Sequence, residues 1–288
     1  AQWISEYDSG DLAIDEIADP ALVNSIARPW HIFRLNDWAL RQDFVLLTQN
    51  RQSAPIPDTV TTIHPQNIFI EPGAKLGHCT LNASTGPVYI GADTEVMEGA
   101  TIRGPFALCE GSVVKMGARI YGATTIGPNS MVGGELKNVV IFGNSNKAHD
   151  GYLGDAVLGE WCNLGAGTSA SNVSNNAGDV QVWANASRYF ENAGTKCGLL
   201  MGDYSRAAIN SSFNTGSVVG VCCNIFTTGL VPKHVPSFTW GEGKAGSYVF
   251  DKAIEHISNW KKFKKQELSN AEIQRLKHIF DTLSSNQV

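Results

Sequence analysis

The stretch from Ile90 to Val132, IGADTEVMEGATIRGPFALCEGSVVKMGARIYGATTIGPNSMV, has an aliphatic residue at every sixth position. These positions are Ile90, Val96, Ile102, Leu108, Val114, Ile120, Ile126 and Val132. If about a third of residues are strongly apolar, such an unbroken series arises by chance on the order of once in thousands. Small residues recur four positions later, at Thr94, Ala100, Ser112, Ala118, Thr124 and Ser130. The stretch is therefore a hexapeptide repeat.

A period of six fits neither an amphipathic helix nor an alternating strand. It is typical of a parallel β-helix, in which each hexad forms a short strand and a turn. Three hexads close one triangular coil, and the aliphatic residue points inward onto its equivalent one coil away. Ile70 and Leu76 begin the same series, and Leu158 and Leu164 continue it. The sequence therefore predicts a mainly β fold, a parallel β-helix with helical segments at both ends.

Two stretches interrupt the period, residues 133–150 and residues 171–196. A solenoid commonly ejects insertions as loops, and binding residues collect on loops. We therefore expect both stretches to leave the stack.

Both ends of the chain have helical patterns. A helix is predicted over residues 20–50, with Asp19 as N-cap before Pro20, and helices are predicted over residues 248–285. The C-terminal helices are expected to cover the open end of the β-helix, and the lysines within 261–265 to form a solvated face. The expected division is residues 1–62 (N-terminal helical segment and linker), 63–240 (β-helix) and 241–288 (C-terminal cap).

Composition limits the classes of protein to which this chain can belong. The chain has 288 residues, 43% of them hydrophobic, and a net charge of −5, which excludes full-length disorder and disfavours nucleic acid as a partner. No long uncharged apolar run predicts a membrane span, and no signal peptide is recognisable. The six cysteines lack CxxC spacing, so a reduced, cytoplasmic location is the simplest expectation. Cys162 and His149 lack further ligands at metal-site spacing, and no metal is predicted.

The densest polar cluster runs from Asn144 to Asp155 and continues to Thr168. It contains His149, and an imidazole is the usual base for deprotonating an amine or hydroxyl nucleophile. The alternative is a structural histidine that bonds to loop backbone. The residues alone leave both open.

Residues 146–155 (NKAHDGYLGD), 163–168 (NLGAGT) and Asn172 resemble the acetyltransferase domain of bacterial bifunctional UDP-N-acetylglucosamine pyrophosphorylase/glucosamine-1-phosphate acetyltransferase. The likeness covers roughly residues 65–235. The whole chain resembles divergent sugar nucleotidyltransferase relatives of that enzyme, through residues 28–36 (RPWHIFRLN) and 143–147 (GNSNK). The resemblance implies a left-handed β-helix, a homotrimer with sites between subunits, and acetyl-CoA as co-substrate.

The resemblance also assigns roles. It makes His149 the general base toward a sugar amine, Asn163 a residue that holds the base and the acceptor, and Ala166 a backbone contact to the acyl-CoA. Four further residues would bind the acceptor: Arg119 and Lys137 its phosphate, and Tyr152 and Asn172 its sugar. Arg119 lies three hexads before Lys137, a full coil, and such stacked cations suit a phosphate clamp.

The sequence departs from the family at four points. One residue is missing between Lys147 and His149, and the insertion at residues 171–196 is long. Val173 replaces a tyrosine, and a downstream lysine has no counterpart in residues 174–179. No glycine-rich nucleotide loop occurs in residues 1–60, so the chain is expected to be the C-terminal part of a nucleotidyltransferase-like protein. The first hypothesis is an acyl-CoA-dependent transferase acting on an amino-sugar phosphate or nucleotide sugar. The alternatives are a non-catalytic trimerisation or ligand-binding β-helix, and a module that still binds a nucleotide sugar.

Overall fold

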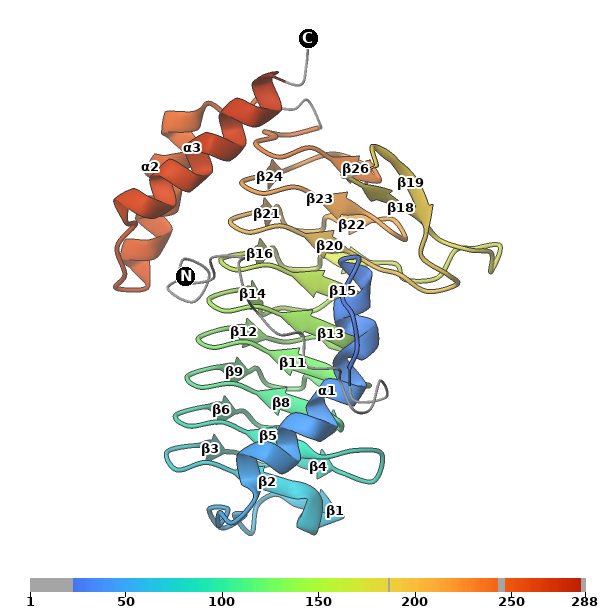
Figure 1. Cartoon of the computed structure of the whole chain (residues 1–288). Coiled ribbons are helices and arrows are strands. Elements are labelled where there is room, and N and C mark those ends of the chain that lie inside the picture. Colours follow the sequence, from blue (N-terminus) through green and yellow to red (C-terminus); the bar gives the residue numbers. More distant parts are fainter. Residues whose placement is uncertain (1–22, 186, 243–246, 286–288) are drawn as a thin grey trace, which may run out of the picture.

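The computed structural model describes residues 23–185, 187–242 and 247–285. A stack of short parallel strands runs through most of this length, and three α-helices lie beside it (Figure 1). The helices are α1 (Trp30–Thr48), α2 (Phe250–Phe263) and α3 (Asn270–Ser285), and η2 (Pro65–Asn67) is a short 3-10 turn. The expected N-cap at Asp19 lies outside the described residues, and the first helix begins at Trp30 rather than at Pro20.

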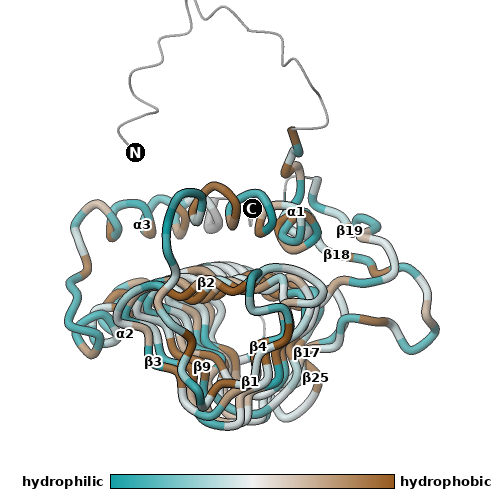
Figure 2. The backbone as a smooth tube through the Cα atoms, turned by 90° about the horizontal axis from the view of Figure 1, so that it is seen from below, coloured by the Kyte–Doolittle hydropathy of each residue, from teal (hydrophilic) through white to brown (hydrophobic). Residues whose placement is uncertain are grey.

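The strands lie on three faces of a left-handed parallel β-helix, seen end-on in Figure 2. Face A comprises β1 (Thr61–Ile63), β4 (Thr80–Asn82), β7 (Thr101–Arg103), β10 (Arg119–Tyr121), β17 (Ser169–Ala170), β22 (Ser212–Phe213) and β25 (Leu230–Val231). Face B comprises β2 (Ile68–Ile70), β5 (Val88–Ile90), β8 (Phe106–Leu108), β11 (Thr124–Ile126), β20 (Leu200–Met201), β23 (Val218–Val219) and β26 (His234–Val235).

Face C comprises β3 (Lys75–Leu76), β6 (Glu95–Val96), β9 (Val113–Val114), β12 (Met131–Val132), β14 (Asn146–Lys147), β16 (Asn163–Leu164), β21 (Arg206–Ala207) and β24 (Asn224–Ile225). The longer strands β13 (Glu135–Ile141) and β15 (Tyr152–Leu158) begin on face A, where β13 pairs with β10, and end on face B. The hairpin β18 (Gln181–Ala184)–β19 (Tyr189–Asn192) is antiparallel and separate.

The predicted inward stack is confirmed. Every aliphatic residue of the hexad series from Ile90 to Val132 is buried in one continuous core. Where the hexads are regular the coil has the expected length, because Val88 pairs with Phe106, its equivalent three hexads further on. Each coil thus buries its apolar residue against its neighbours, as hexapeptide repeats do.

One predicted loop does not form. Residues 133–150 stay in the stack as part of β13 and as β14, so the expectation that they leave it was wrong. The period breaks there because the coil is shorter: Met131 pairs with Asn146 and not with His149, which lies three hexads further on. The other stretch, 171–196, does leave the stack, since Asn163 pairs with Arg206 and the β18–β19 hairpin lies between them in the sequence.

The helices pack lengthwise along the stack. The helix α1 lies along face B of the stack (Figures 1 and 2). Its Trp30 and Phe33 side chains are buried in one cluster with Val157 and Leu200. The helices α2 and α3 pack on the corner between faces B and C, around Cys222 and Phe238. They reach back along that corner, where the Lys264 ammonium donates to the Asn129 carbonyl at 3.0 Å. The expected cap over the open end is therefore a brace along the side of the last coils.

The expectation of a solvated lysine face was also wrong for two of its members. Lys261 is buried, forms an ion pair with Glu272 and lies over the ring of Trp161. Lys264 lies over the same ring and bonds to the stack. Lys262 and Lys265 are exposed, as expected.

Candidate active site

The residues predicted to bind the acceptor gather on face A, on consecutive coils. Strand register places Arg119 beside Glu135, and Glu135 beside Tyr152. The same ladders place Tyr121 beside Lys137, and Lys137 beside Gly154. Alternate residues of these strands point outward, so these side chains share one outer surface.

The predicted stacking of Arg119 on Lys137 is wrong in register. The coil between them is shorter than three hexads, so Arg119 pairs with Glu135. Arg119 lies 3.7 Å from the Glu135 carboxylate, which also accepts a 2.6 Å bond from the Tyr121 hydroxyl. The Lys137 ammonium lies over the Tyr121 ring, 5.8 Å from its centre. The two cations therefore share a surface on which one carboxylate lies between them.

The Tyr152 side chain lies over Gly154, two residues further along the same strand. A Cβ atom on Gly154 would lie 2.2 Å from the Tyr152 hydroxyl oxygen, so the phenol occupies the space that a side chain would need. Burial, followed by the nearby Tyr121, Asp155 and Glu135, raises the pKa of Tyr152 to about 12. The phenol is therefore protonated at neutral pH and able to donate a hydrogen bond.

Asn172 is fixed by a carboxylate that the sequence analysis did not single out. Its amide donates to Asp155, which is buried and accepts a second bond from Asn138 at 2.6 Å. Asp155 has a positive φ of 45°, which turns its side chain into the corner between faces A and B. A signal was present, because Asp155 closes the conspicuous string 146–155, but spacing alone did not pair it with Asn172.

His149 lies exposed at the corner between faces C and A, just before β15. Two residues earlier, Lys147 is only 1% exposed and points into the coil. Its ammonium donates to the carbonyl oxygens of His149 and Asp150. Burial lowers the pKa of Lys147 to about 8, an effect that the Asp150 charge partly opposes.

Asn163 and Ala166 lie on the next coil, where Ala166 occupies the corner position equivalent to that of His149. Asn163 is on face C and accepts a long 3.4 Å bond from Asn146, three residues before His149. Ala166 lies at the corner, and its carbonyl accepts the N–H of Asn210 at 2.7 Å. The chain therefore brings Arg119, Lys137 and Tyr152 onto one surface beside His149, with Asn172 buried next to Tyr152, whereas Asn163 lies on a different face.

Three cavities lie along the stack, and none of the three has His149 in its lining. A cleft of about 300 Å³ on face A is lined by Arg103, Arg119 and Tyr121. A second, of about 670 Å³, lies where residues 171–179 leave the stack and includes Lys233. In one chain His149 is thus on open surface beside the acceptor cluster.

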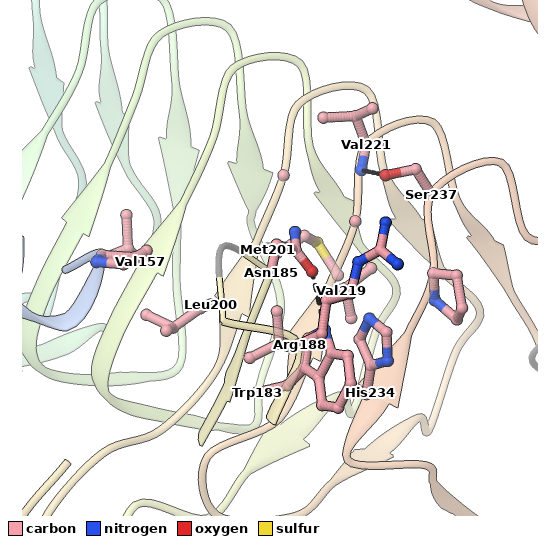
Figure 3. A pocket seen from close by; sticks show the side chains of 15 residues that line it. Val157, Trp183, Asn185, Arg188, Leu200, Met201, Val219, Val221, His234 and Ser237 are labelled. Carbon is pink, nitrogen blue, oxygen red and sulfur yellow. Dashed lines mark hydrogen bonds between the residues drawn. The ribbon is translucent and has the colours of Figure 1, made fainter. Parts of the chain in front are cut away.

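The third cavity, of about 590 Å³, lies on face B between the β18–β19 hairpin and the last coils (Figure 3). Trp183 of the hairpin stacks on His234 with ring centres 4.5 Å apart, and Arg188 projects beside them. Burial lowers the pKa of His234, so this imidazole is neutral at pH 7. The cavity is separate from the face A cluster.

Metal and thiol chemistry have little support in this part of the chain. Across the described ranges, no group of three or more His, Cys, Asp or Glu residues is arranged to hold a metal ion. Burial raises the pKa of Cys79 and Cys223 to about 11 and that of Cys162 to about 12, so these thiols are protonated and unreactive. None of the described helices is long and apolar enough to span a membrane.

Comparison with known proteins confirms the predicted resemblance. The Bifunctional protein GlmU of Methanocaldococcus jannaschii is 32% identical over 119 residues, which are 41% of this chain and 29% of that protein. A bifunctional sugar-1-phosphate nucleotidylyltransferase/acetyltransferase of Sulfurisphaera tokodaii is 27% identical over 212 residues, 73% of this chain and 46% of that protein. The chain thus spans less than half the length of these curated relatives. No family model matches it.

Among solved structures, a UDP-N-acetylglucosamine acyltransferase of Francisella novicida aligns with 80% of this chain and 87% of its own. Its sequence identity is 13% and the TM-score 0.45.

Proposed function

We propose that this chain transfers an acyl group, acetyl in the first instance, from an acyl-CoA thioester to the amine of a phosphorylated or nucleotide-linked amino sugar. The observation that carries the proposal is the surface of Arg119, Lys137 and Tyr152 on consecutive coils, with His149 at its edge and Asn172 buried next to Tyr152. Cations and a protonated phenol on one surface suit a sugar phosphate. Bifunctional nucleotidylyltransferase/acetyltransferases among the similar proteins support acyl transfer.

The chemistry assigned to His149 is proton transfer. Its imidazole takes a proton from the sugar amine as the nitrogen attacks the thioester carbon. The tetrahedral intermediate collapses, the C–S bond breaks, and the imidazolium returns the proton to the departing thiolate. The Ala166 backbone is assigned to the acyl-CoA and Asn163 to the reacting groups. Because Asn163 lies on face C, away from the face A surface, the complete site is proposed to form between the subunits of a homotrimer.

The test of this function pairs His149→Ala with His78→Ala. His78 occupies the corner position equivalent to His149 four coils earlier, because strand register links Leu76 to Lys147 through Val96, Val114 and Val132. Both histidines are exposed, so neither loss should unfold the stack. Purified protein is assayed with acetyl-CoA and a panel of free, phosphorylated and nucleotide-linked amino sugars.

We expect His149→Ala to lower kcat by about 10²–10⁴-fold on the best acceptor, because general-base catalysis typically contributes that much. Thermal stability and acetyl-CoA affinity, measured by calorimetry, should stay at wild-type values, and His78→Ala should remain fully active. Full activity of His149→Ala would remove the residue from the mechanism. A wild-type protein inactive on every acceptor would instead favour the non-catalytic β-helix.

A further inference from the structure

Lys147 interrupts an otherwise aliphatic ladder inside the coil. On face C, strand register aligns it with Val132 in the preceding coil, and the neighbouring pair Asn146–Asn163 aligns it with Leu164 in the next. The other inward residues of the ladder are Leu76, Val96, Val114, Val132, Leu164, Ala207 and Ile225. An ammonium in such a place is costly unless it is hydrogen-bonded, so an aliphatic side chain would be the stabilising choice.

The hydrogen bonds of this ammonium go to the loop that carries His149. It donates to the carbonyl of His149 and to that of Asp150, 3.2 Å away. The loop also rests directly on the coil below, since a Cβ atom on Gly134 would lie 2.8 Å from the carbonyl oxygens of both His149 and Gly151. The segment is therefore held from inside by Lys147 and from below by backbone.

At two equivalent corners in earlier coils, the carbonyl is bonded by the backbone of the following coil and not by a side chain. The carbonyls of His78 and Glu98, which occupy the position of His149 in earlier coils, accept the N–H groups of Gly99 and Gly117 from the following coil. The short coil changes this pattern at His149. The N–H of Gly167 in the following coil bonds to Asp150, one residue further along, at 3.1 Å.

We propose that Lys147 is a positioning residue that fixes the loop bearing His149, by supplying from inside the coil the hydrogen bond that a neighbouring coil supplies at other corners. Because a carbonyl bonded to a cation resists rotation more than one bonded to water, the peptide between His149 and Asp150 keeps one orientation. The imidazole is then presented at a fixed angle to face A. The catalytic consequence rests on the proposed acyl transfer, whereas the ordering of the loop does not.

The experiment replaces Lys147 with Met, which fills the space without a donor, and with Gln, which keeps an uncharged donor on a shorter stem. Lys262→Met, on the exposed side of α2, is the matched control for loss of a lysine. Hydrogen exchange of the whole chain is followed by mass spectrometry, and acetyl-CoA and the best amino-sugar acceptor supply the kinetic constants.

In Lys147→Met we expect the amides of Gly167 and Glu135, which donate to the carbonyls of Asp150 and Gly151, to exchange about 10- to 100-fold faster while the other coils keep their protection. The value of kcat should fall roughly 10- to 100-fold with KM for acetyl-CoA nearly unchanged, because a misplaced base affects the transition state. Lys147→Gln should lie between Lys147→Met and wild type in both measurements, and Lys262→Met should match wild type.

Unchanged exchange of the Gly167 and Glu135 amides in folded Lys147→Met would overturn the proposal. Faster exchange spread over the whole stack in both variants would also overturn it, since Lys147 would then be an ordinary core contact. If Lys147→Met fails to fold, Lys147→Gln decides by the same exchange criterion. Local loosening in a protein whose wild type is inactive would support the positioning role and contradict the proposed function.

Discussion

At the scale of single residues, the buried Lys147 ammonium lowers the folding stability, and the size of this effect depends on pH. Burial holds its pKa at about 8 in the folded chain, below the 10.5 of an unfolded lysine. Between these values the unfolded state binds more protons, so folding stability should rise with pH from about 8 to 10.5 and carry a constant penalty below 8. The penalty is on the order of 3 kcal/mol.

Chemical denaturation at pH 7 and at pH 10 should therefore separate wild type from Lys147→Met. We expect the variant to be more stable at pH 7, with the advantage shrinking by pH 10, where most of the wild-type penalty has been relieved. Subtracting the two proteins cancels the tyrosines and other lysines that titrate in the same range. A difference that stays constant between the two pH values would contradict a lowered pKa.

At the scale of elements, we expect the brace formed by α2 and α3 to depend on the ion pair between Lys261 and Glu272. Burial raises the pKa of Glu272, but hydrogen bonds from Lys261, Ser269 and Tyr204 outweigh this and lower it to about 2. The carboxylate therefore stabilises the fold above about pH 4.5, and this contribution is lost as the pH falls toward 2.

Glu272→Gln should destabilise the brace by roughly 2–4 kcal/mol at neutral pH, because it leaves the buried Lys261 ammonium without its counter-charge. Glu255→Gln on α2 is the control, since its pair with Lys252 is fully solvated and should be worth almost nothing. The stability of both variants is measured by thermal unfolding and by hydrogen exchange in α2 and α3. Equal stability of the two variants would show that the Lys261–Glu272 pair does not hold the brace.

At the scale of the whole molecule, apolar side chains emerge along the corner that carries His149. Met116 and Ile209 occupy the same corner position on other coils and are 67% and 69% exposed, and Phe226 nearby is 43% exposed. Apolar residues aligned in this way on a solenoid mark a surface that a second copy can bury.

We predict that light scattering will give a mass three times the 31.0 kDa of the chain. Ile209→Asp should shift the population toward monomer and lower acyl transfer with it, because the site is proposed to be shared. Leu46→Asp places the same charge on an equally exposed residue of α1, away from this corner, and should remain a trimer. A monomeric wild type at micromolar concentration would exclude the shared site.

The sequence by itself determined the architecture, because each hexad of the repeat forms its strand and turn from its own residues. The residue types within a hexad indicate which side chain points inward and where the chain turns. The core from Ile90 to Val132 could therefore be predicted without knowing any distant contact. The C-terminal helices and the excursion of residues 171–196 were also readable, from apolar spacing and from the length of the interruption. The face A residues named from the family motif share one surface for the same reason, since alternate strand positions point outward.

The tertiary structure decided what depends on register between coils. Coils shorter than three hexads kept residues 133–150 in the stack, turned Lys147 inward and paired Arg119 with Glu135 instead of Lys137. These changes of register could not be predicted from the sequence, because a shortened coil and a looped-out insertion both interrupt the six-residue period in the same way. Docking of the Lys261 helix, and the bond between Asp155 and Asn172, likewise depend on which coil corner each segment meets. Local patterns fix which residues point inward where the hexads are regular, and the stacking of coils fixes the rest.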